Sequence, residues 1–449
     1  KNIKEIKNIE AALKKIEKES EIELSEKQKE AIEEINKNNV LIITGGPGTG
    51  KTTIIKTIID IYENRGKKVI LAAPTGRAAK KMTEATGKEA STLHRLLGIG
   101  KLDDEGIYSR HSDYKGEPID ADLIVVDELS MVDMFVMNYL LNCIYQGTKL
   151  ILVGDVDQLA SVGPGSVLKD LINSEVINTV KLDKIFRQAA KSKIVLNAHR
   201  VNNGLGFIKN DDEEIEEDTK QDFFFIKQNS TERMLQEVIS LSTGRLEKFG
   251  NYDFFKNIQV LTPTKKGPLG TRELNKALQA VLNPNLEELP ERKSGDIVYR
   301  VGDRVMQIKN NYDLQFKRDN GEYGTGVFNG DVGFITDIDP RGGILKVRYD
   351  DRIVTYFNEE LGQLELAYAV TVHKSQGSEY DCVVIPLFEV PSRLKYRNLL
   401  YTAVTRAKRL LVIVGDEGIW YEMAANDKKT LRYTMLGRFL KEYGNESTY

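Results

Sequence analysis

Short apolar runs alternate with amphipathic segments along most of this chain. The stretch at residues 53–65 has the spacing of an amphipathic helix, and it stops at Gly66. Apolar runs of strand length occupy residues 40–44, 68–73, 123–126, 150–153, 258–262, 382–386 and 409–414. Strands that are apolar on both faces and separated by helices are typical of a parallel sheet covered on both sides. The pattern therefore predicts an α/β fold.

Three segments depart from this pattern. Residues 297–356 contain short β-type runs divided by Gly and Asp turns, which predicts a small β-barrel inserted in an α/β domain. The polar, Gly-containing stretch at 98–121 predicts a hairpin insertion. Residues 1–19 form one amphipathic helical pattern. Because the chain begins at Lys1 and not at Met, we expect this helix to be the remnant of a longer N-terminal region.

A phosphate-binding loop follows the first apolar run. Residues 45–52 read GGPGTGKT and match the G-x-x-x-x-G-K-[ST] pattern in full, between a predicted strand and a predicted helix. The glycines let backbone N–H groups surround phosphates, and the helix presents its positive end to the same anion. Lys51 would neutralise β/γ charge, and the Thr52 hydroxyl would ligate Mg²⁺. This segment predicts an ATP site.

A pair of carboxylates ends the strand predicted at 123–126. Asp127 would hold Mg²⁺, directly or through water, and Glu128 would orient and deprotonate the attacking water. By itself, a strand followed by Asp-Glu is also typical of a solvated strand end. Beside a phosphate loop, the pair predicts a hydrolase, because a hydrolytic water needs a base.

Two glutamines have alternative interpretations. Gln158 follows the strand at 150–153, where it would sense the γ-phosphate or simply belong to a turn that ends the strand. Gln28 stands three residues after Ser25, so the two form a capping box that begins a helix. The Gln28 amide would alternatively bind the edge of adenine, and one residue can do both.

Composition adds little to this picture. The 449 residues are 41% hydrophobic and 29% charged, as in ordinary globular proteins, and the net charge of −3 neither favours nor opposes a polyanionic partner. Cys143 and Cys382 have no metal-binding or disulfide spacing, which suits a reducing cytoplasm. No apolar run reaches the roughly 20 residues of a membrane span, so we expect no membrane partner.

Eight motifs occur in an order that resembles superfamily 1 helicases, most closely the RecD-like DNA helicases of bacteria. They are GGPGTGKT (45–52), APTGR (73–77), STLH (91–94), VVDELSM (125–131), LVGDVDQL (152–159), FRQ (186–188), VHKSQGSE (372–379) and YTAVTR (401–406). The resemblance covers roughly residues 24–414. It implies a cytoplasmic, bacterial, monomeric motor that uses ATP and Mg²⁺ and binds single-stranded DNA and its junctions with duplex.

The resemblance also implies a domain organisation with two RecA-like domains and ATP in the cleft between them. The expected parts are an N-terminal helix (1–23), a first motor domain (24–185) with the hairpin (98–121), a second motor domain (186–288 and 360–449) and an SH3-like β-barrel (289–359). In relatives the hairpin is a pin that splits the duplex. Tyr108 and Tyr114 would stack on bases there, although exposed loop tyrosines without such a role are common.

The family supplies arginines from its second half to the nucleotide, and Arg187 and Arg406 stand at those motif positions. A guanidinium stabilises the charge spread over the transferred phosphoryl oxygens. The predicted catalytic set is Lys51, Asp127, Glu128, Gln158, Arg187 and Arg406, with Thr52 and Asp127 as the Mg²⁺ ligands. The predicted ATP-binding residues are Gln28, Gly45, Gly46, Pro47, Gly48, Thr49, Gly50, Lys51, Thr52, Thr53, Gln158, Arg187, Gly377, Glu379 and Arg406.

The resemblance also assigns DNA-contacting positions, at places where a strand is followed by a helix. They map onto Pro74, Thr75, Arg77, Thr92, His94, Thr262, Thr264, His373, Lys374 and Ser375. Hydroxyls, amides and a few cations at such positions hold phosphates without reading sequence. His94 taken alone is as typical of a packed or capping histidine. Glu379 resembles the family residue that links the nucleotide and DNA sites.

The expected function is an ATP-dependent helicase or translocase, and the family implies movement in the 5′-to-3′ direction. Two other functions fit parts of the sequence, namely a nucleic-acid clamp without strand separation and a P-loop phosphotransferase for a small molecule. The phosphotransferase explains neither the two arginine motifs nor the β-barrel insertion. RNA remains an alternative track, because contacts to the backbone alone do not test for a 2′-hydroxyl.

Overall fold

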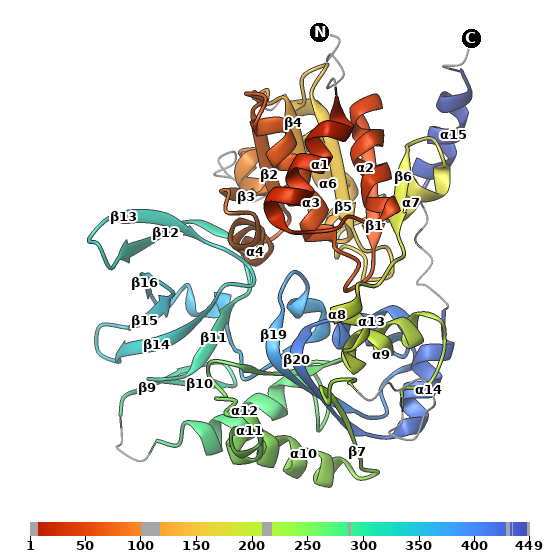
Figure 1. The fold of residues 1–449 in the computed structure, drawn as a ribbon. Coiled ribbons are helices and arrows are strands. Elements are labelled where there is room, and N and C mark those ends of the chain that lie inside the picture. Colours follow the sequence, from red (N-terminus) through yellow and green to blue (C-terminus); the bar gives the residue numbers. More distant parts are fainter. Residues whose placement is uncertain are drawn as a thin grey trace. The chain divides into compact units, whose positions relative to one another are not determined.

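The structure is a computed structural model that describes residues 8–99, 117–208, 218–285, 289–427, 432 and 434–446. Tyr108 and Tyr114, and with them most of the predicted hairpin, lie outside these residues. The chain divides into two compact units, residues 1–190 with 429–449 and residues 191–428. Each unit is built on its own parallel sheet (Figure 1).

The first unit contains a six-stranded sheet with the order β3-β2-β4-β5-β1-β6, and all its pairings are parallel. Its strands are β1 (Val40–Gly45), β2 (Val69–Ala73), β3 (Ala90–Thr92), β4 (Leu123–Val126), β5 (Lys149–Gly154) and β6 (Thr179–Leu182). Its helices are α1 (Ile9–Ser20), α2 (Glu26–Lys37), α3 (Lys51–Glu63), α4 (Gly76–Thr86), α5 (Leu93–Leu96), α6 (Met134–Cys143), α7 (Val167–Ser174), α8 (Arg187–Ala190) and α15 (Leu436–Glu446).

Successive residues of the central strands β1, β4 and β5 enter two separate cores. Along β1, Leu41 and Ile43 pack with α1, α2 and α3 on one face, while Ile42 packs with α6 and α7 on the other. Side chains alternate between the faces of a strand, so a strand covered on both sides must be apolar throughout. This arrangement explains the continuous apolar runs of the sequence.

The last described helix, α15, belongs to the first unit. Leu436 and Leu440 pack on the core that contains α7, and Arg432 donates hydrogen bonds to the loop between β5 and α7. We predicted that residues 360–449 would lie in the second motor domain. In the structure residues 429–449 group instead with the first unit, where the apolar face of α15 packs against α7.

The second unit contains a five-stranded parallel sheet with the order β18-β8-β19-β20-β7. Its strands are β7 (Phe223–Lys227), β8 (Ile258–Thr262), β18 (Ala369–Thr371), β19 (Tyr380–Leu387) and β20 (Ala407–Gly415). Its α-helices are α9 (Lys193–Asn202), α10 (Thr231–Ser240), α11 (Leu246–Gly250), α12 (Thr271–Leu282), α13 (Arg397–Val404) and α14 (Glu417–Ala425), and a π-helix (Leu241–Arg245) joins α10 to α11.

An antiparallel sheet is inserted between α12 and β18 of the second unit (Figure 1). Seven strands form it in the order β13-β12-β16-β15-β14-β11-β17, and β9 and β10 form a separate hairpin. The bounds are β9 (Glu291–Ser294), β10 (Ile297–Arg300), β11 (Arg304–Gln307), β12 (Asn311–Arg318), β13 (Tyr323–Val327), β14 (Val332–Asp339), β15 (Ile344–Tyr349), β16 (Arg352–Tyr356) and β17 (Leu364–Leu366). Among the described residues the two outer strands, β13 and β17, do not pair to close a barrel.

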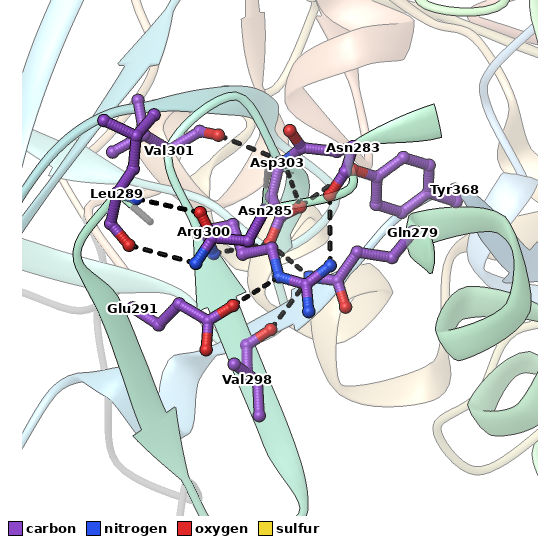
Figure 2. A network of polar contacts seen from close by, with 10 residues as sticks. All are labelled: Gln279, Asn283, Asn285, Leu289, Glu291, Val298, Arg300, Val301, Asp303 and Tyr368. Atoms are coloured by element: carbon purple, nitrogen blue, oxygen red, sulfur yellow. Dashed lines mark hydrogen bonds and ion pairs between the residues drawn. The ribbon is translucent and has the colours of Figure 1, made fainter. Parts of the chain in front are cut away.

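A buried carboxylate ties this inserted sheet to α12 and β18 (Figure 2). Asp303 is fully buried and accepts hydrogen bonds from the side chains of Gln279, Asn283 and Tyr368 and from the N–H of Arg300, at 2.6–2.8 Å. All four donors are neutral, and burial raises the pKa of Asp303. The network fixes the angle at which the insertion leaves the parallel sheet.

The predicted α/β class with parallel sheets and an inserted β-module is confirmed. The strands predicted at 123–126 and 258–262 are found with those bounds. Among the helices of the described part, none is long and apolar enough to cross a bilayer.

Candidate functional site

The phosphate loop joins β1 to α3 in the first unit. Gly48 and Gly50 have φ values of 75° and 80°, in the left-handed region that favours glycine. A Cβ on Gly50 would lie 2.4 Å from Gln28 Nε2 and 2.8 Å from a ring carbon of Phe186. The backbone N–H of Phe186 also donates to Gly48 O at 3.2 Å. Sequence reasoning missed Phe186 as a support of this loop.

Gln28 forms both halves of a capping box and also contacts the phosphate loop. Its Oε1 accepts from Ser25 N at 2.9 Å, and its own N–H donates to Ser25 Oγ at 3.3 Å. Its Nε2 donates to Gly50 O at 3.2 Å, and the side chain is fully buried. The capping interpretation is confirmed, and the second contact ties the start of α2 to the nucleotide loop.

Lys51 opens α3, and its ammonium lies over the loop. Nζ donates to Gly45 O at 2.6 Å and to Gly46 O at 3.0 Å. Thr49 Oγ1 donates to Gly46 O at 2.9 Å. The loop therefore already has the curled form whose N–H groups an anion requires, with a cation beside it.

Asp127 and Glu128 follow β4, whose carboxyl end lies at the same edge of the sheet as that of β1. Burial and the charge of Glu128 raise the pKa of Asp127 to about 6, although the Glu128 N–H and the charge of Lys51 oppose the shift. Asp127 Oδ1 accepts from that N–H at 2.8 Å. Glu128 has a φ of 53°, a strained conformation for a residue other than glycine.

Gln158 lies in the turn after β5. Its Nε2 donates to Asp155 Oδ2 at 3.5 Å, whereas its buried Oε1 has no hydrogen-bond partner in the described part of the chain. A buried acceptor without a donor is costly, which is a reason to expect a ligand or water there.

The two predicted arginines lie in different units. Arg187 begins α8 and groups with the first unit, whereas the prediction placed it at the start of the second motor domain. Arg406 follows α13 in the second unit and is nearly fully buried. Its guanidinium donates to Thr402 O at 3.1 Å, to Ser378 O at 3.0 Å and to Thr405 Oγ1 at 3.2 Å. In this conformation Arg406 therefore braces its own unit.

Gly377 and Glu379, which were also predicted to bind the nucleotide, belong to the second unit. They lie between a 3-10 turn (Val372–Ser375) and β19. Gly377 has a φ of 69°, in the region that favours glycine. Glu379 forms an ion pair with Lys408 at 3.7 Å.

The DNA-contacting positions predicted in the first unit lie where β2 and β3 end. Pro74 precedes Thr75, whose Oγ1 caps α4 by accepting from Ala78 N at 3.2 Å, and Arg77 lies in the first turn of α4. Thr92 caps α5 in the same way. His94 lies in α5, and burial lowers its pKa against the opposing charge of Asp133, so it is neutral at pH 7.

Two predicted DNA contacts in the second unit are fully buried. Thr262 Oγ1 donates to Leu269 O at 2.7 Å, and Ser375 Oγ donates to Val372 O at 2.8 Å. Each bond uses the only hydroxyl proton, so both residues stabilise their own loops here. This finding differs from the prediction that they hold DNA phosphates. Thr264 Oγ1 remains partly exposed and bonds only to the backbone of Lys266.

Lys374 and His373 lie in the 3-10 turn after β18. Burial lowers the pKa of His373. Lys374 Nζ forms an ion pair with Glu365 at 2.6 Å, and Lys265 Nζ contacts the other carboxylate oxygen at 3.2 Å. Sequence reasoning singled out neither Glu365 nor Lys265, although Lys265 follows the predicted Thr264 directly.

Comparisons with known families match three parts of the chain. Residues 23–215 match the AAA domain, residues 274–349 match the ATP-dependent RecD-like DNA helicase SH3 domain, and residues 366–414 match the UvrD-like helicase C-terminal domain. The second match begins in α12 and covers most of the antiparallel sheet.

Two relatives match nearly the whole chain. One is the ATP-dependent RecD2 DNA helicase of Deinococcus radiodurans, 36% identical over 92% of this chain and 52% of that protein. Another is the RecBCD enzyme subunit RecD of Mycolicibacterium smegmatis, 32% identical over 93% of this chain and 76% of that protein. The chain thus spans about half the length of the first relative.

A solved structure has a similar fold. The Pif1 helicase from Bacteroides, in complex with ADP-AlF3 and ssDNA, matches with a TM-score of 0.50 at 19% identity, over 95% of this chain and 98% of that one.

Proposed function

Because this chain belongs to the RecD-like family of superfamily 1 DNA helicases, we propose that it is an ATP-driven motor that moves on single-stranded DNA and unwinds duplex. The observation that carries this proposal is the arrangement at the edge of the first sheet. The charge of Lys51 acts on the half-buried Asp127, and the strained Glu128 follows directly. A cation, a metal-binding carboxylate and a base are the parts that NTP hydrolysis needs.

The phosphate loop binds the β- and γ-phosphates of ATP. Lys51 Nζ exchanges its two backbone carbonyl partners for phosphate oxygens, which are stronger acceptors because they are charged. Gln28 holds Gly50 O and keeps the loop against α2. To bind adenine as well, the Gln28 amide must exchange one of its hydrogen bonds, to Ser25 N or to Gly50 O, for a hydrogen bond to the base.

Mg²⁺ fits the residues present at this site. Asp127 is a half-buried carboxylate whose raised pKa reports an unfavourable charge, and a divalent cation would relieve it. The described residues contain no cluster of three or more His, Cys, Asp or Glu side chains that could hold a metal. Mg²⁺ needs none, because it keeps several waters and uses one or two protein ligands with substrate phosphates. Thr52 and Asp127 would be those ligands, and a bound ion would supply positive charge beside the phosphates.

Glu128 is the general base, and Gln158 orients the attacking water. The Glu128 backbone strain supports this role, since such strain persists where the surrounding structure requires it. The free Gln158 Oε1 is an acceptor that a water can satisfy. Arg187 and Arg406 stabilise the transition-state charge. For Arg406 this step requires it to exchange its bonds to Ser378 O and Thr402 O.

Single-stranded DNA is the track, and movement is 5′ to 3′. Thr75, Thr92 and Thr264 offer hydroxyls at loops that follow β2, β3 and β8, and Lys374 offers a cation after β18. Side chains at such loops contact phosphates and sugars without reading bases. The partly exposed residues carry this part of the proposal, whereas Thr262 and Ser375 support their loops from inside.

Lys51→Ala tests the ATP site. We expect ATP turnover to fall to background because the β/γ charge loses its cation. Lys56→Ala, an exposed lysine on the same helix, is the matched control and should keep the wild-type rate. A steady-state phosphate-release assay reads both variants. Turnover that survives in Lys51→Ala would remove the basis of the site assignment.

Forked DNA tests the motor. We expect single-stranded DNA to raise the ATPase rate and a fork with a 5′ tail to be unwound in preference to one with a 3′ tail. Stimulation without unwinding would indicate a translocase or clamp. A rate that does not respond to DNA or RNA would favour a phosphotransferase.

A further inference from the structure

A single carboxylate bridges two lysines that come from separate loops of the second unit. Glu365 lies in β17, Lys265 follows β8, and Lys374 lies in the turn after β18. Strands β8 and β18 are parallel neighbours, with Thr262 opposite Thr371, so both lysines leave the same carboxyl edge of the sheet. Glu365 reaches this edge from the inserted antiparallel sheet.

The backbone that carries Glu365 is held rigidly. Leu364 and Leu366 on either side are buried, which directs the residue between them to the opposite face of the strand. Asn275 Nδ2 donates to Leu366 O at 3.0 Å. The Arg304 guanidinium donates to Ala367 O, also at 3.0 Å. The backbone beside the carboxylate is therefore anchored by a buried network, while the carboxylate itself is held by the two lysines.

The charges of the cluster match those of a bound phosphate. Burial tends to raise the pKa of Glu365, but the hydrogen bond from Lys374 and the charges of Lys374 and Lys265 outweigh it, so the pKa is lowered. Glu365 is thus an anion at neutral pH with two oxygens on two ammonium groups. The side chains of Lys265, Glu365 and Lys374 are 51%, 31% and 20% exposed, so solvent reaches the cluster.

We propose that Glu365 is a built-in substitute for a DNA phosphate: it occupies Lys265 and Lys374 when no DNA is bound, and an incoming phosphate displaces it. This inference rests on the proposed function, because it takes Lys374 as a DNA contact. It adds Lys265 to the phosphate site and assigns Glu365 as a competitor that lowers DNA affinity.

The exchange has a mechanical use. A motor must release each phosphate after holding it, and an affinity that is too high would stop movement. With Glu365 present, a departing phosphate leaves behind two lysines that are immediately neutralised. The lysines also remain oriented toward the strand, so rebinding needs little reordering of long side chains.

Glu365→Gln tests this competition, because glutamine keeps the shape and removes the charge. We expect the variant to bind a fluorescein-labelled oligo-dT about three- to tenfold more tightly than wild type at the same salt concentration, as measured by anisotropy without nucleotide. Glu237→Gln is the matched control, since Glu237 pairs with Arg245 in the same unit and its side chain is 26% exposed. It should bind like wild type.

A double-mutant cycle shows whether the gain acts through the lysines. In a Lys265→Ala, Lys374→Ala background, Glu365→Gln should change oligo-dT affinity by less than about twofold. An equal gain in that background would mean that only the overall charge matters, and would overturn the proposal. Thermal unfolding of each variant establishes that it is folded.

The remaining outcomes separate the two levels of inference. Unchanged or weaker binding by a folded Glu365→Gln, with wild type binding normally, overturns the role of Glu365 and leaves the motor intact. A wild-type chain that binds neither oligo-dT nor a forked duplex overturns the proposed function and this inference with it.

Discussion

At the scale of single residues, three buried charged groups, Asp303, Arg304 and Arg406, are hydrogen-bonded to neutral partners. Asp303 has four donors and none is a cation (Figure 2). Arg406 and Arg304 likewise bond to backbone carbonyls. Such groups cost little while every bond is made, but losing one partner leaves a buried group unsatisfied. Substitutions that change a donor into an acceptor, or the reverse, should therefore be costly here.

Asp303→Asn should lower the free energy of unfolding by about 1–3 kcal/mol. The new amide would place N–H groups against Gln279 Nε2 and the Arg300 N–H, or against Asn283 Nδ2 and the Tyr368 hydroxyl. Donors would then face donors in a buried site. Urea denaturation measures the change.

Asp337→Asn provides the control for this prediction. Asp337 is 53% exposed, and its carboxylate forms an ion pair with Lys346. Its loss should change stability by no more than about 0.5 kcal/mol. If Asp303→Asn were as mild as this control, the network would not hold the insertion in place.

At the scale of elements, the start of α2 is linked to the phosphate loop through one side chain. Ser25 and Gln28 complete the capping box, and only Gln28 continues to Gly50. The two residues therefore allow the capping role to be separated from any nucleotide role.

Ser25→Ala should cost about 0.5–2 kcal/mol of stability and leave the KM for ATP unchanged, because only the cap is lost. Gln28→Ala should cost at least as much and also raise the KM, because Gly50 loses its support and adenine loses a candidate partner. Steady-state kinetics and thermal unfolding separate the two effects. If Gln28→Ala and Ser25→Ala had the same KM for ATP, Gln28 would act only as a capping residue.

Elements with an unbroken apolar run could be predicted from the sequence. Strand β4 was found with its bounds because four apolar residues precede Asp127. Strand β12 was not predicted by its bounds because it contains no unbroken apolar run: Leu314 and Phe316 are buried between exposed neighbours. Strand β17 is only three residues long. The phosphate loop was likewise evident because all the residues of its motif lie within residues 45–52.

The rest of the site depends on contacts between distant segments. Nothing next to Thr262 or Ser375 indicates that each hydroxyl bonds to a backbone carbonyl. The pairing of Glu365 with Lys265 joins residues 100 positions apart. Such contacts arise only once the sheets are assembled, so a local pattern cannot reveal them.

At the scale of the whole molecule, the first unit is formed by both ends of the chain. Residues 1–190 and 429–449 belong to it, and residues 191–428 form the second unit. Arg432 marks the return, with hydrogen bonds to Ser161 Oγ at 3.2 Å, Gly163 O at 2.7 Å and Gly165 O at 2.6 Å. Those acceptors follow Gln158 in the same loop. The C-terminal segment therefore braces the loop that carries a proposed catalytic side chain.

Arg432→Ala should destabilise the first unit by about 1.5–3 kcal/mol, because hydrogen bonds from a charged group are lost together. We expect faster amide hydrogen exchange in α7 and α15, with the second unit unchanged. Arg438→Ala, in the helix α15 that follows Arg432, is the control, since Arg438 is 70% exposed and pairs with Glu442 one turn away. Equal exchange in the two variants would contradict a bracing role for Arg432.

The same return has a consequence for how the protein is made. During translation, α7 emerges long before α15, so the surface that receives Leu436 and Leu440 stays uncovered while the whole second unit is synthesised. Contacts of such large sequence separation form slowly, and exposed apolar surface invites aggregation. We expect nascent chains stopped near residue 428 to have a complete second unit and to require chaperone protection on the first.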